Sequence, residues 1–251
     1  MKYKEVVNKL INNLFGVLVI TLVWGCTNSE GNAPTTQNSC LPPGLMDHAL
    51  AIYTFNNGSL EDTSGNNYHL TNPTTASIGS DRSGNQNCAY QFNDANGDYL
   101  ELVNPEFLND IQTTDLSISF WIKPIDNSYA KLLIREDLEF CNHQMGLWNI
   151  SFINSRLNCV VGSRIVGGVH PGQNGVWKHI VMTINASDLI LYINGIPHSG
   201  IEASTVCNPM NVGNLYIGRS YNGSMDDIFV FDKVLTPEEV MELYNITACC
   251  S

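Results

Sequence analysis

Hydrophobic and polar residues alternate most regularly between Thr114 and Lys123. Every second residue in this segment is apolar, which predicts an extended strand with one face against a core. The apolar face comprises Leu116, Ile118, Phe120 and Ile122, and the opposite face comprises Ser117, Ser119, Trp121 and Lys123. Pro124 is expected to end the strand, because proline has no N–H group to donate to a neighbouring strand.

A second segment predicts two strands and a tight turn. Apolar residues dominate Trp177–Ile184, polar residues follow from Asn185 to Asp188, and Leu189–Ile193 is apolar throughout. The polar residues favour a turn, and a short run that is apolar on both faces is typical of a fully buried strand. Asn194 and Gly195 come next, and because both tolerate positive φ angles they predict a hairpin turn.

Several further short segments have the composition of strands and are separated by polar turns. They are Leu50–Phe55, Ala89–Phe92, Tyr99–Leu102, Lys131–Ile134, Trp148–Ile153, Leu157–Val161, Asn214–Gly218 and Asp227–Phe231. The stretch from Gly162 to Gly175 has little apolar patterning and is predicted to be a loop. One helix is predicted, because Thr236, Pro237 and Glu239 have the spacing of a capping box with proline in the first turn. The pattern favours an all-β sandwich or jelly roll.

Residues 1–25 are similar to a bacterial lipoprotein signal. Lys2, Lys4 and Lys9 precede a mostly apolar run that ends at Gly25-Cys26, which is typical of an export signal. In a lipoprotein Cys26 becomes the lipid-bearing first residue, and another type of anchor or simple secretion are the alternatives. Residues 26–39 are small and polar and predict a flexible tether, followed by one domain over residues 40–251. The expected location is the cell envelope, with a lipid anchor in the membrane.

The chain is acidic, with a formal charge of -12 from 12 bases and 24 acids. Without the leader, which holds three of the bases and one acid, nine bases and 23 acids leave -14. Nucleic acid is therefore excluded as a partner, because its phosphates require Lys and Arg. The charge is compatible with divalent cations and neutral polymers such as glycans, and equally with a simple gain in solubility.

Seven cysteines follow Cys26, and in an exported chain most of them are expected to form disulfides. An odd number leaves one free or paired between chains. None has the Cys-x-x-Cys spacing of a zinc site. Because the termini of sandwich domains often lie together, Cys40 is predicted to join Cys249 or Cys250.

Four parts of the chain together resemble the laminin-G-like, concanavalin A-like jelly-roll family that is common among exported bacterial proteins. They are AIYTFNNGSLEDTSGNNYHL; SDRSGNQNCAYQF with DYLEL; LSISFWIKP with WKHIVMTINASDLILYINGIP; and IGRSYNGSMDDIFVFDKVLTPEEVMELYN. The resemblance spans residues 48–246. It implies an all-β fold, namely a two-sheet antiparallel jelly-roll sandwich with one short C-terminal helix.

The family includes glucanases, so an enzyme has to be considered. Glucanases of this fold carry Glu-x-Asp-x-x-Glu on one strand, whereas the nearest cluster here is Glu136-Asp137-Leu138-Glu139. Adjacent carboxylates on a strand point to opposite faces, so the pair that glycoside hydrolysis needs is not formed. The histidines also form no nucleophile motif. We expect no catalysis, with a glycoside hydrolase whose carboxylates are displaced as the alternative.

A structural calcium ion is implied by the resemblance. In members that bind calcium, the first polar loop and the Asp-Asp of the closing strand come together. Carried over, the ligands are Asn56, the carbonyl of Gly58, Asp62 and Asp226, and such oxygen donors suit a hard cation. The alternative is that Asp62 caps its own turn and Asp226 bonds to a neighbouring loop.

A glycan-binding face requires aromatic rings beside polar side chains, because sugar C–H groups stack on rings while hydroxyls bind amides and carboxylates. The candidates are Tyr129, Arg135, His143, Trp148 and Tyr221. Trp148 alternates in phase with Ile150 and Phe152, so a core position is favoured for it over a ligand contact. The expected function is non-catalytic binding of a glycan or cell-surface protein, with a purely structural or adhesive envelope module as a further alternative.

Overall fold

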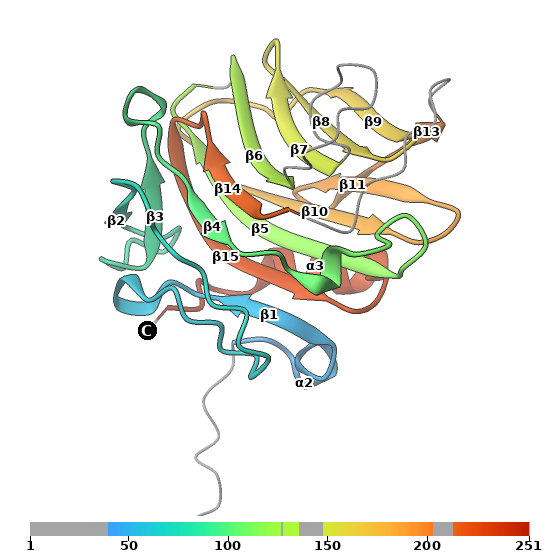
Figure 1. Ribbon diagram of the computed structural model, residues 1–251, viewed down its shortest axis with the longest axis horizontal. Helices are drawn as coiled ribbons and strands as arrows, with labels where there is room; N and C mark the ends of the chain where they lie inside the picture. Colours follow the sequence, from blue (N-terminus) through green and yellow to red (C-terminus); the bar gives the residue numbers. More distant parts are fainter. Residues whose placement is uncertain (1–39, 127, 136–147, 203–212, 251) are drawn as a thin grey trace, which may run out of the picture. The chain divides into compact units, whose positions relative to one another are not determined.

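The computed structural model describes residues 40–126, 128–135, 148–202 and 213–250. In this part of the chain, two antiparallel β sheets pack face to face, and a short helix near the C-terminus lies outside one of them (Figure 1). The fold predicted from the sequence, an all-β two-sheet jelly-roll sandwich with one short C-terminal helix, is confirmed. The predicted leader and tether lie outside the described residues, and so does the end of the chain at residue 251.

The first sheet, sheet A, contains eight strands within the described residues. They are β1 (Ala49–Tyr53), β2 (Ser77–Gly79), β3 (Ala89–Phe92), β5 (Leu116–Pro124), β10 (Lys178–Ile184), β11 (Leu189–Ile193), β12 (Ile196–Ser199) and β15 (Gly223–Phe231). Their order is β12-β11-β10-β5-β15-β3-β2, and β1 pairs with the second half of β15. The long strands β5 and β15 therefore hold the sheet together.

The second sheet, sheet B, has the order β13-β9-β8-β7-β6-β14-β4. Its strands are β4 (Leu100–Leu102), β6 (Tyr129–Arg135), β7 (Trp148–Ile153), β8 (Arg156–Val161), β9 (Arg164–Val169), β13 (Ile201–Glu202) and β14 (Leu215–Arg219). The prediction of a loop over Gly162–Gly175 is wrong for β9, which pairs with β8. Gly167 and Gly168 interrupt the apolar pattern of β9, although Val166 belongs to the core.

The predicted helix is α3 (Pro237–Asn245), and its capping box is present. The Thr236 hydroxyl accepts a hydrogen bond from the Glu239 N–H at 3.2 Å, and the Glu239 carboxylate accepts one from the Thr236 N–H at 2.9 Å. The other helical segments were not predicted. They are the short helix α2 (Pro43–Met46) and the 3-10 turns η1 (Asn56–Gly58), η2 (Asp94–Asn96) and η3 (Glu106–Leu108).

The core lies between the sheets and follows the alternation seen in the sequence. All four apolar residues of β5 belong to this core, and Pro124 ends the strand as predicted. The opposite face of sheet A is not left to solvent. Val181, Tyr192 and Phe229 on that face form a second apolar cluster with Val240 and Leu243 of α3. The helix therefore covers the part of the outer face that crosses β10, β5 and the second half of β15.

The hairpin between β11 and β12 has the predicted two-residue turn. Asn194 and Gly195 have φ angles of 50° and 79°, which is the conformation of the tight turns that match strand twist. The Asn194 side chain also accepts a hydrogen bond from the His179 N–H on β10 at 2.9 Å. Asn194 thus ties the turn to the next strand as well as forming it.

Two disulfides are present among the described residues, and one of them is the predicted link. Cys40 is bonded to Cys249, and Cys88 is bonded to Cys250. Cys159 is buried in the core with a free thiol, and burial raises its pKa. The remaining two cysteines, Cys141 and Cys207, lie outside the described residues.

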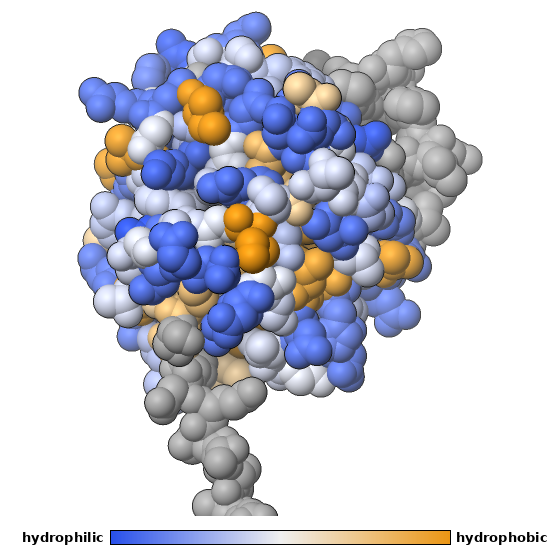
Figure 2. Space-filling model, turned by 90° about the vertical axis from the view of Figure 1, so that its left-hand side faces the viewer, coloured by the Kyte–Doolittle hydropathy of each residue, from blue (hydrophilic) through white to orange (hydrophobic). Residues whose placement is uncertain are grey.

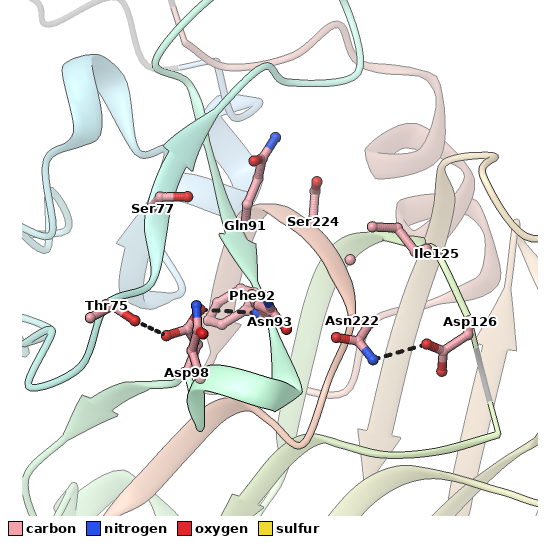
Figure 3. A pocket seen from close by; sticks show the side chains of 12 residues that line it. Thr75, Ser77, Gln91, Phe92, Asn93, Asp98, Ile125, Asp126, Asn222 and Ser224 are labelled. Carbon is pink, nitrogen blue, oxygen red and sulfur yellow. Dashed lines mark hydrogen bonds between the residues drawn. The ribbon is translucent and has the colours of Figure 1, made fainter.

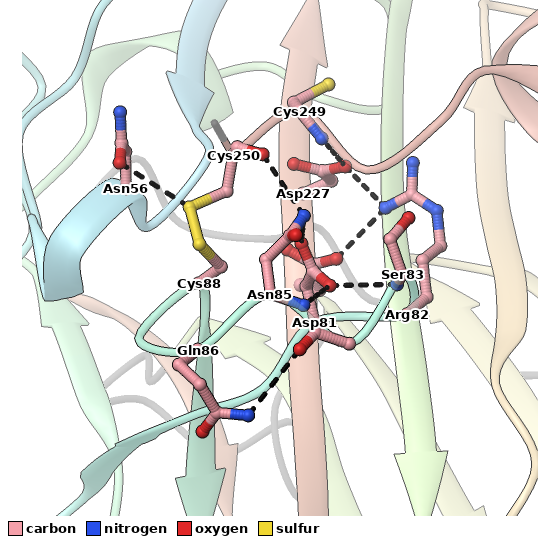
Figure 4. Close-up of a disulfide and its surroundings, with 12 residues drawn as sticks. Asn56, Asp81, Arg82, Ser83, Asn85, Gln86, Cys88, Asp227, Cys249 and Cys250 are labelled. Atoms are coloured by element: carbon pink, nitrogen blue, oxygen red, sulfur yellow. Dashed lines mark hydrogen bonds and ion pairs between the residues drawn. A yellow bond between two sulfur atoms is a disulfide. The ribbon is translucent and has the colours of Figure 1, made fainter.

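A buried ionic cluster lies beside these disulfides and is centred on Arg82 (Figure 4). The guanidinium contacts two adjacent carboxylates of β15, Asp226 at 3.0 Å and Asp227 more closely still. It also donates to the carbonyl of Thr247 at 2.8 Å, and it lies over the ring of Trp121 at 4.5 Å. One side chain therefore connects the β2–β3 loop, two central strands and the segment after α3.

The two carboxyls share a single positive charge inside the protein. Burial, with the neighbouring Asp227, raises the pKa of Asp226 to about 8. Burial also raises the pKa of Asp227, to about 6, because Arg82 offsets only part of the desolvation. Within the folded protein the pair therefore binds protons more tightly than the same two residues do in the unfolded chain.

Removing the guanidinium should destabilise the domain strongly. Arg82→Met leaves two buried carboxyls without a counter-ion and removes the donor to the C-terminal segment. Loss of one partner from a buried ion pair costs about 3–5 kcal/mol, which urea denaturation would measure. Arg156→Met is the matched control, because Arg156 is exposed on β8 and its loss should cost under about 1 kcal/mol. Equal effects of the two substitutions would contradict the central role of Arg82.

The raised pKa values of Asp226 and Asp227 also predict how the free energy of unfolding changes with pH. Between the ordinary aspartate pKa of 3.8 and about 8, the folded protein holds more protons at this pair than the unfolded chain does. This contribution to stability therefore falls as the pH rises through that interval. Asp226→Asn should flatten the decline in a series of melting curves from pH 5 to pH 8. The exposed Asp115→Asn should leave the slope unchanged, and a wild-type slope in Asp226→Asn would refute the assignment.

Candidate functional site

A polar pocket opens on the outer face of sheet A beyond the part that α3 covers. It has a volume of about 490 Å³ and is lined by β2, β3, the start of β15 and the turns next to them. Figure 3 shows its side chains, with Gln91 standing up from β3 between Ser77 and Ser224. The pocket is therefore built on strands of the sheet, with turns forming its sides.

Strand register brings the polar residues of the pocket floor into one row. Gln91 pairs with Ser77 on one side and with Ser224 on the other. Alternation within β3 explains the arrangement, because Tyr90 and Phe92 face the core and Gln91 faces outward. A side chain at Gly79 would collide with the Gln91 amide, since an added Cβ would lie 2.6 Å from its nitrogen. The glycine thus leaves room for Gln91 to lie along the strand.

One wall of the pocket is fixed by Asp98. This buried carboxylate accepts a hydrogen bond from the Thr75 hydroxyl at 2.6 Å and another from the Asn93 N–H at 3.0 Å. The first bond joins the turn between β3 and β4 to the segment before β2, and the second closes that turn. Because both carboxylate oxygens bind the protein, Asp98 shapes the wall and holds Thr75 in place.

The opposite wall is fixed by Asn222. Its amide donates to the Asp126 carboxylate at 2.9 Å, and its side-chain oxygen accepts from the Asp94 N–H at 2.9 Å. The Asn222 carbonyl also accepts from the N–H of Ile125 at 2.9 Å. The Ile125 side chain is 73% exposed, so this wall presents an apolar surface next to a carboxylate.

Several polar side chains in the pocket are available to a ligand. Within the described part of the chain, the side chains of Ser77, Gln91 and Ser224 form no hydrogen bonds with the protein, and all three are at least partly exposed. On the side of the molecule where β2 and β3 lie, the surface is mostly hydrophilic and its apolar side chains are scattered (Figure 2). Such a surface differs from the contiguous apolar patches that mark many protein interfaces.

This site was not predicted from the sequence, and the residues that were predicted to bind a glycan are not among those that line it. Trp148 and Tyr221 are buried in the core at 2% and 0% exposure, which confirms the core interpretation for Trp148 and rules out ring stacking on a sugar for both. Arg135 is 3% exposed and donates to the Gly213 carbonyl at 3.2 Å and to Asn109 at 2.9 Å. Tyr129 is exposed on β6, and His143 lies outside the described residues.

The residues proposed for calcium make other contacts. Asp62 accepts hydrogen bonds from the N–H groups of Ile52, Ser64 and Tyr68 and from the Ser64 hydroxyl, all within 3.0 Å. The Gly58 carbonyl accepts one from the Tyr90 hydroxyl at 2.8 Å. Asn56 contacts Cys250, and Asp226 contacts Arg82. Within the described ranges no group of three or more His, Cys, Asp or Glu residues is arranged to hold a metal. Calcium binding stays a prediction.

Among the described residues, one serine and one histidine form a hydrogen-bonded pair, but neither is accessible. Glu136, Asp137 and Glu139 lie outside the described residues. Ser119 and His179 are 2.7 Å apart, but both are buried beneath α3, where Trp121 and Tyr244 stack beside the imidazole. Burial and the nearby Arg82 lower the pKa of His179 to about 3. The hydrogen bond between Ser119 and His179 is therefore a structural contact.

No helix in the described ranges has both the length and the apolar character needed to cross a membrane. Among known proteins, botulinum neurotoxin type X of Clostridium botulinum is 26% identical to this chain, and the alignment covers 80% of the chain and 16% of the toxin. The chain thus spans about a sixth of the length of this relative.

Solved structures of toxin binding regions share the fold. A structure of botulinum neurotoxin type C, which depends on interaction with two ganglioside molecules to enter cells, has a TM-score of 0.63 and 18% identity, over 80% of this chain and 52% of the other. The binding domain of botulinum neurotoxin DC, solved with rat synaptotagmin II, has a TM-score of 0.62, 16% identity and the same coverages. The chain therefore corresponds to about half of each of these structures.

The family of this chain follows from the match of its sequence to a family model. Residues 94–241, more than half of the chain, match the model of one superfamily of jelly-roll proteins. This match includes β5, the hairpin of β10 and β11, and most of α3, which are the elements that also carried the resemblance in the sequence. The chain belongs to the concanavalin A-like lectin/glucanase superfamily.

Proposed function

We propose that this protein is an exported, non-catalytic binding protein whose jelly-roll domain holds a glycan, or the glycan of a cell-surface protein, in the pocket around Gln91. The observation that carries the proposal is the row of unpaired polar side chains formed by Ser77, Gln91 and Ser224. Hydroxyl and amide groups each donate and accept hydrogen bonds. They can therefore satisfy sugar hydroxyls, which do the same.

The walls of the pocket are held in place by hydrogen bonds, which favours a binding site over an incidental depression in the surface. Asp98 and Asn222 are held by the protein, so a ligand would not have to order them. Binding costs less free energy when the site is already in its final geometry. Entry of one toxin that shares the fold depends on ganglioside molecules, and the binding domain of another was solved with rat synaptotagmin II. Both favour recognition at a cell surface over an inert structural role. This support concerns the surface alone, because gangliosides carry sialic acid and the lining of this pocket is acidic.

The proposed location is the cell envelope, with a lipid on Cys26 and a tether leading to the domain. The apolar leader and the position of Cys26 in the sequence support this part of the proposal. Mass spectrometry of the mature protein would test it, because lipidation at Cys26 adds acyl chains that Cys26→Ala must lack.

Gln91→Ala should weaken glycan binding without affecting the fold. The substitution removes a side chain that is exposed and has no partner in the protein, so the melting temperature should stay the same. Loss of one or two ligand hydrogen bonds, each worth about 1 kcal/mol, should raise the dissociation constant about five- to thirtyfold. A glycan array would first supply an oligosaccharide that the full chain binds, and titration would then compare the variants.

The matched control is Gln173→Ala, which removes the same side chain from an exposed loop outside the pocket. Its dissociation constant should equal that of the unaltered protein. Equal binding by Gln91→Ala and Gln173→Ala would contradict the pocket as the binding site.

The structural calcium ion predicted from the sequence is also part of the proposal, and it has a separate test. A calcium ion that binds only the folded state stabilises it increasingly as the free calcium concentration rises above the dissociation constant, so the melting temperature should be higher in excess calcium than in chelator. Asp62→Asn should abolish the difference, since Asp62 is the carboxylate of the proposed set on the first polar loop. An identical melting temperature in calcium and in chelator would remove calcium from the proposal.

A further inference from the structure

We infer that the pocket around Gln91 selects uncharged glycans and rejects those that carry a carboxylate. This inference rests on the proposed function and narrows it to one class of ligand. It follows from the charges that line the pocket, from their order within the strand register, and from the acceptor atoms that Asp126 leaves open.

Within the described residues, the pocket is lined by two carboxylates and by no Lys, Arg or His. Asp98 forms part of one wall and Asp126 part of the other, and all the remaining lining residues are uncharged. An acidic sugar placed between these walls would lose water and meet two charges of its own sign. Like charges at close range in a partly buried site disfavour binding.

The base nearest to this row in the strand register lies beyond the lining. Lys123 on β5 pairs with Ser224 and so stands one strand farther from Gln91, exposed and outside the pocket. A single ammonium group at the outer end of the row cannot neutralise both walls. Its position gives the structure an internal test, because an acidic ligand would depend on Lys123 and a neutral ligand would not.

Asp126 can also contribute directly to the binding of a neutral glycan. Its Oδ2 accepts the Asn222 amide at 2.9 Å, and its only other contact in the described part of the chain is a long one of 3.4 Å from the Ser128 hydroxyl to Oδ1. An ionised carboxylate offers about four acceptor positions, so several remain for sugar hydroxyls. Hydrogen bonds to a charged acceptor are stronger than those between neutral groups. Exposed Ile125, next to Asp126, offers an apolar surface to sugar C–H groups.

The test compares two sets of immobilised oligosaccharides of equal length. One set consists of glucose, galactose and mannose units, and the other ends in a sialic or uronic acid. Binding of the full chain is measured in EDTA, so that no metal ion can bridge two carboxylates, and at ionic strengths from about 0.05 to 0.3 M. The variants are Asp126→Asn and Lys123→Gln, with Asp115→Asn as an exposed control outside the pocket.

The inference predicts binding of the neutral set with little dependence on salt. Asp126→Asn should then weaken binding about three- to tenfold, because an amide accepts fewer and weaker hydrogen bonds than a carboxylate. Lys123→Gln and Asp115→Asn should leave the dissociation constant unchanged. Equal melting temperatures for all variants show that the comparison is between folded proteins.

With an acidic ligand, the substitutions Asp126→Asn and Lys123→Gln would have different effects on binding. Preferential binding of the carboxylate-bearing set, strengthened by Asp126→Asn and weakened by Lys123→Gln, would overturn the inference and leave the proposed function standing. Absence of binding to both sets and to a wider glycan array would overturn the proposed glycan function, and the inference with it.

Discussion

The structure depends on one buried charge, the guanidinium of Arg82. The central strand β15 carries two adjacent carboxyls into the interior, and two ionised carboxylates without compensation would be too costly to bury. Arg82 compensates them from the β2–β3 loop, and its second nitrogen holds the chain after α3. One side chain therefore ties the loop, the strand and the C-terminal segment to one another. The ring of Trp121 lies 4.5 Å from the guanidinium and adds a cation–π contact.

The outer face of sheet A is divided by this cluster into two regions with different roles. On one side α3 covers Val181, Tyr192 and Phe229, and the sheet has a second apolar core. On the other side the same sheet carries the polar row that includes Gln91. The helix ends near Arg82, and it does not extend over β3 and β2. The pocket lies on the part of the sheet that the helix leaves uncovered.

Much of the fold could be predicted from the sequence, because its signals are local. The alternation in β5, the Asn-Gly turn after β11 and the capping box of α3 each lie within a few residues and were confirmed. Strand β9 was missed because its glycines carry no pattern. The covered outer face was also missed, since a tryptophan and two serines on the polar side of β5 do not reveal that a helix packs there.

The site could not be predicted, because it consists of relations between distant segments. Gln91, Ser77 and Ser224 are ordinary polar residues in the sequence, and only the strand register places them in a row. The sequence drew attention to aromatic residues, but Trp148 and Tyr221 face the core. The polar position of Gln91 between Tyr90 and Phe92 was the available signal, and it indicates only an outward side chain.

The two disulfides give the domain a covalent path for mechanical force. Cys40 is bonded to Cys249, Cys250 follows in the chain, and Cys250 is bonded to Cys88, which directly precedes β3. Tension applied to the chain ahead of Cys40 and resisted at Gln91 passes through these bonds and three residues of β3. It bypasses β1, the polar loops and every hydrogen bond between strands. A load on this route therefore stretches covalent bonds, and the sheets do not have to unzip to carry it.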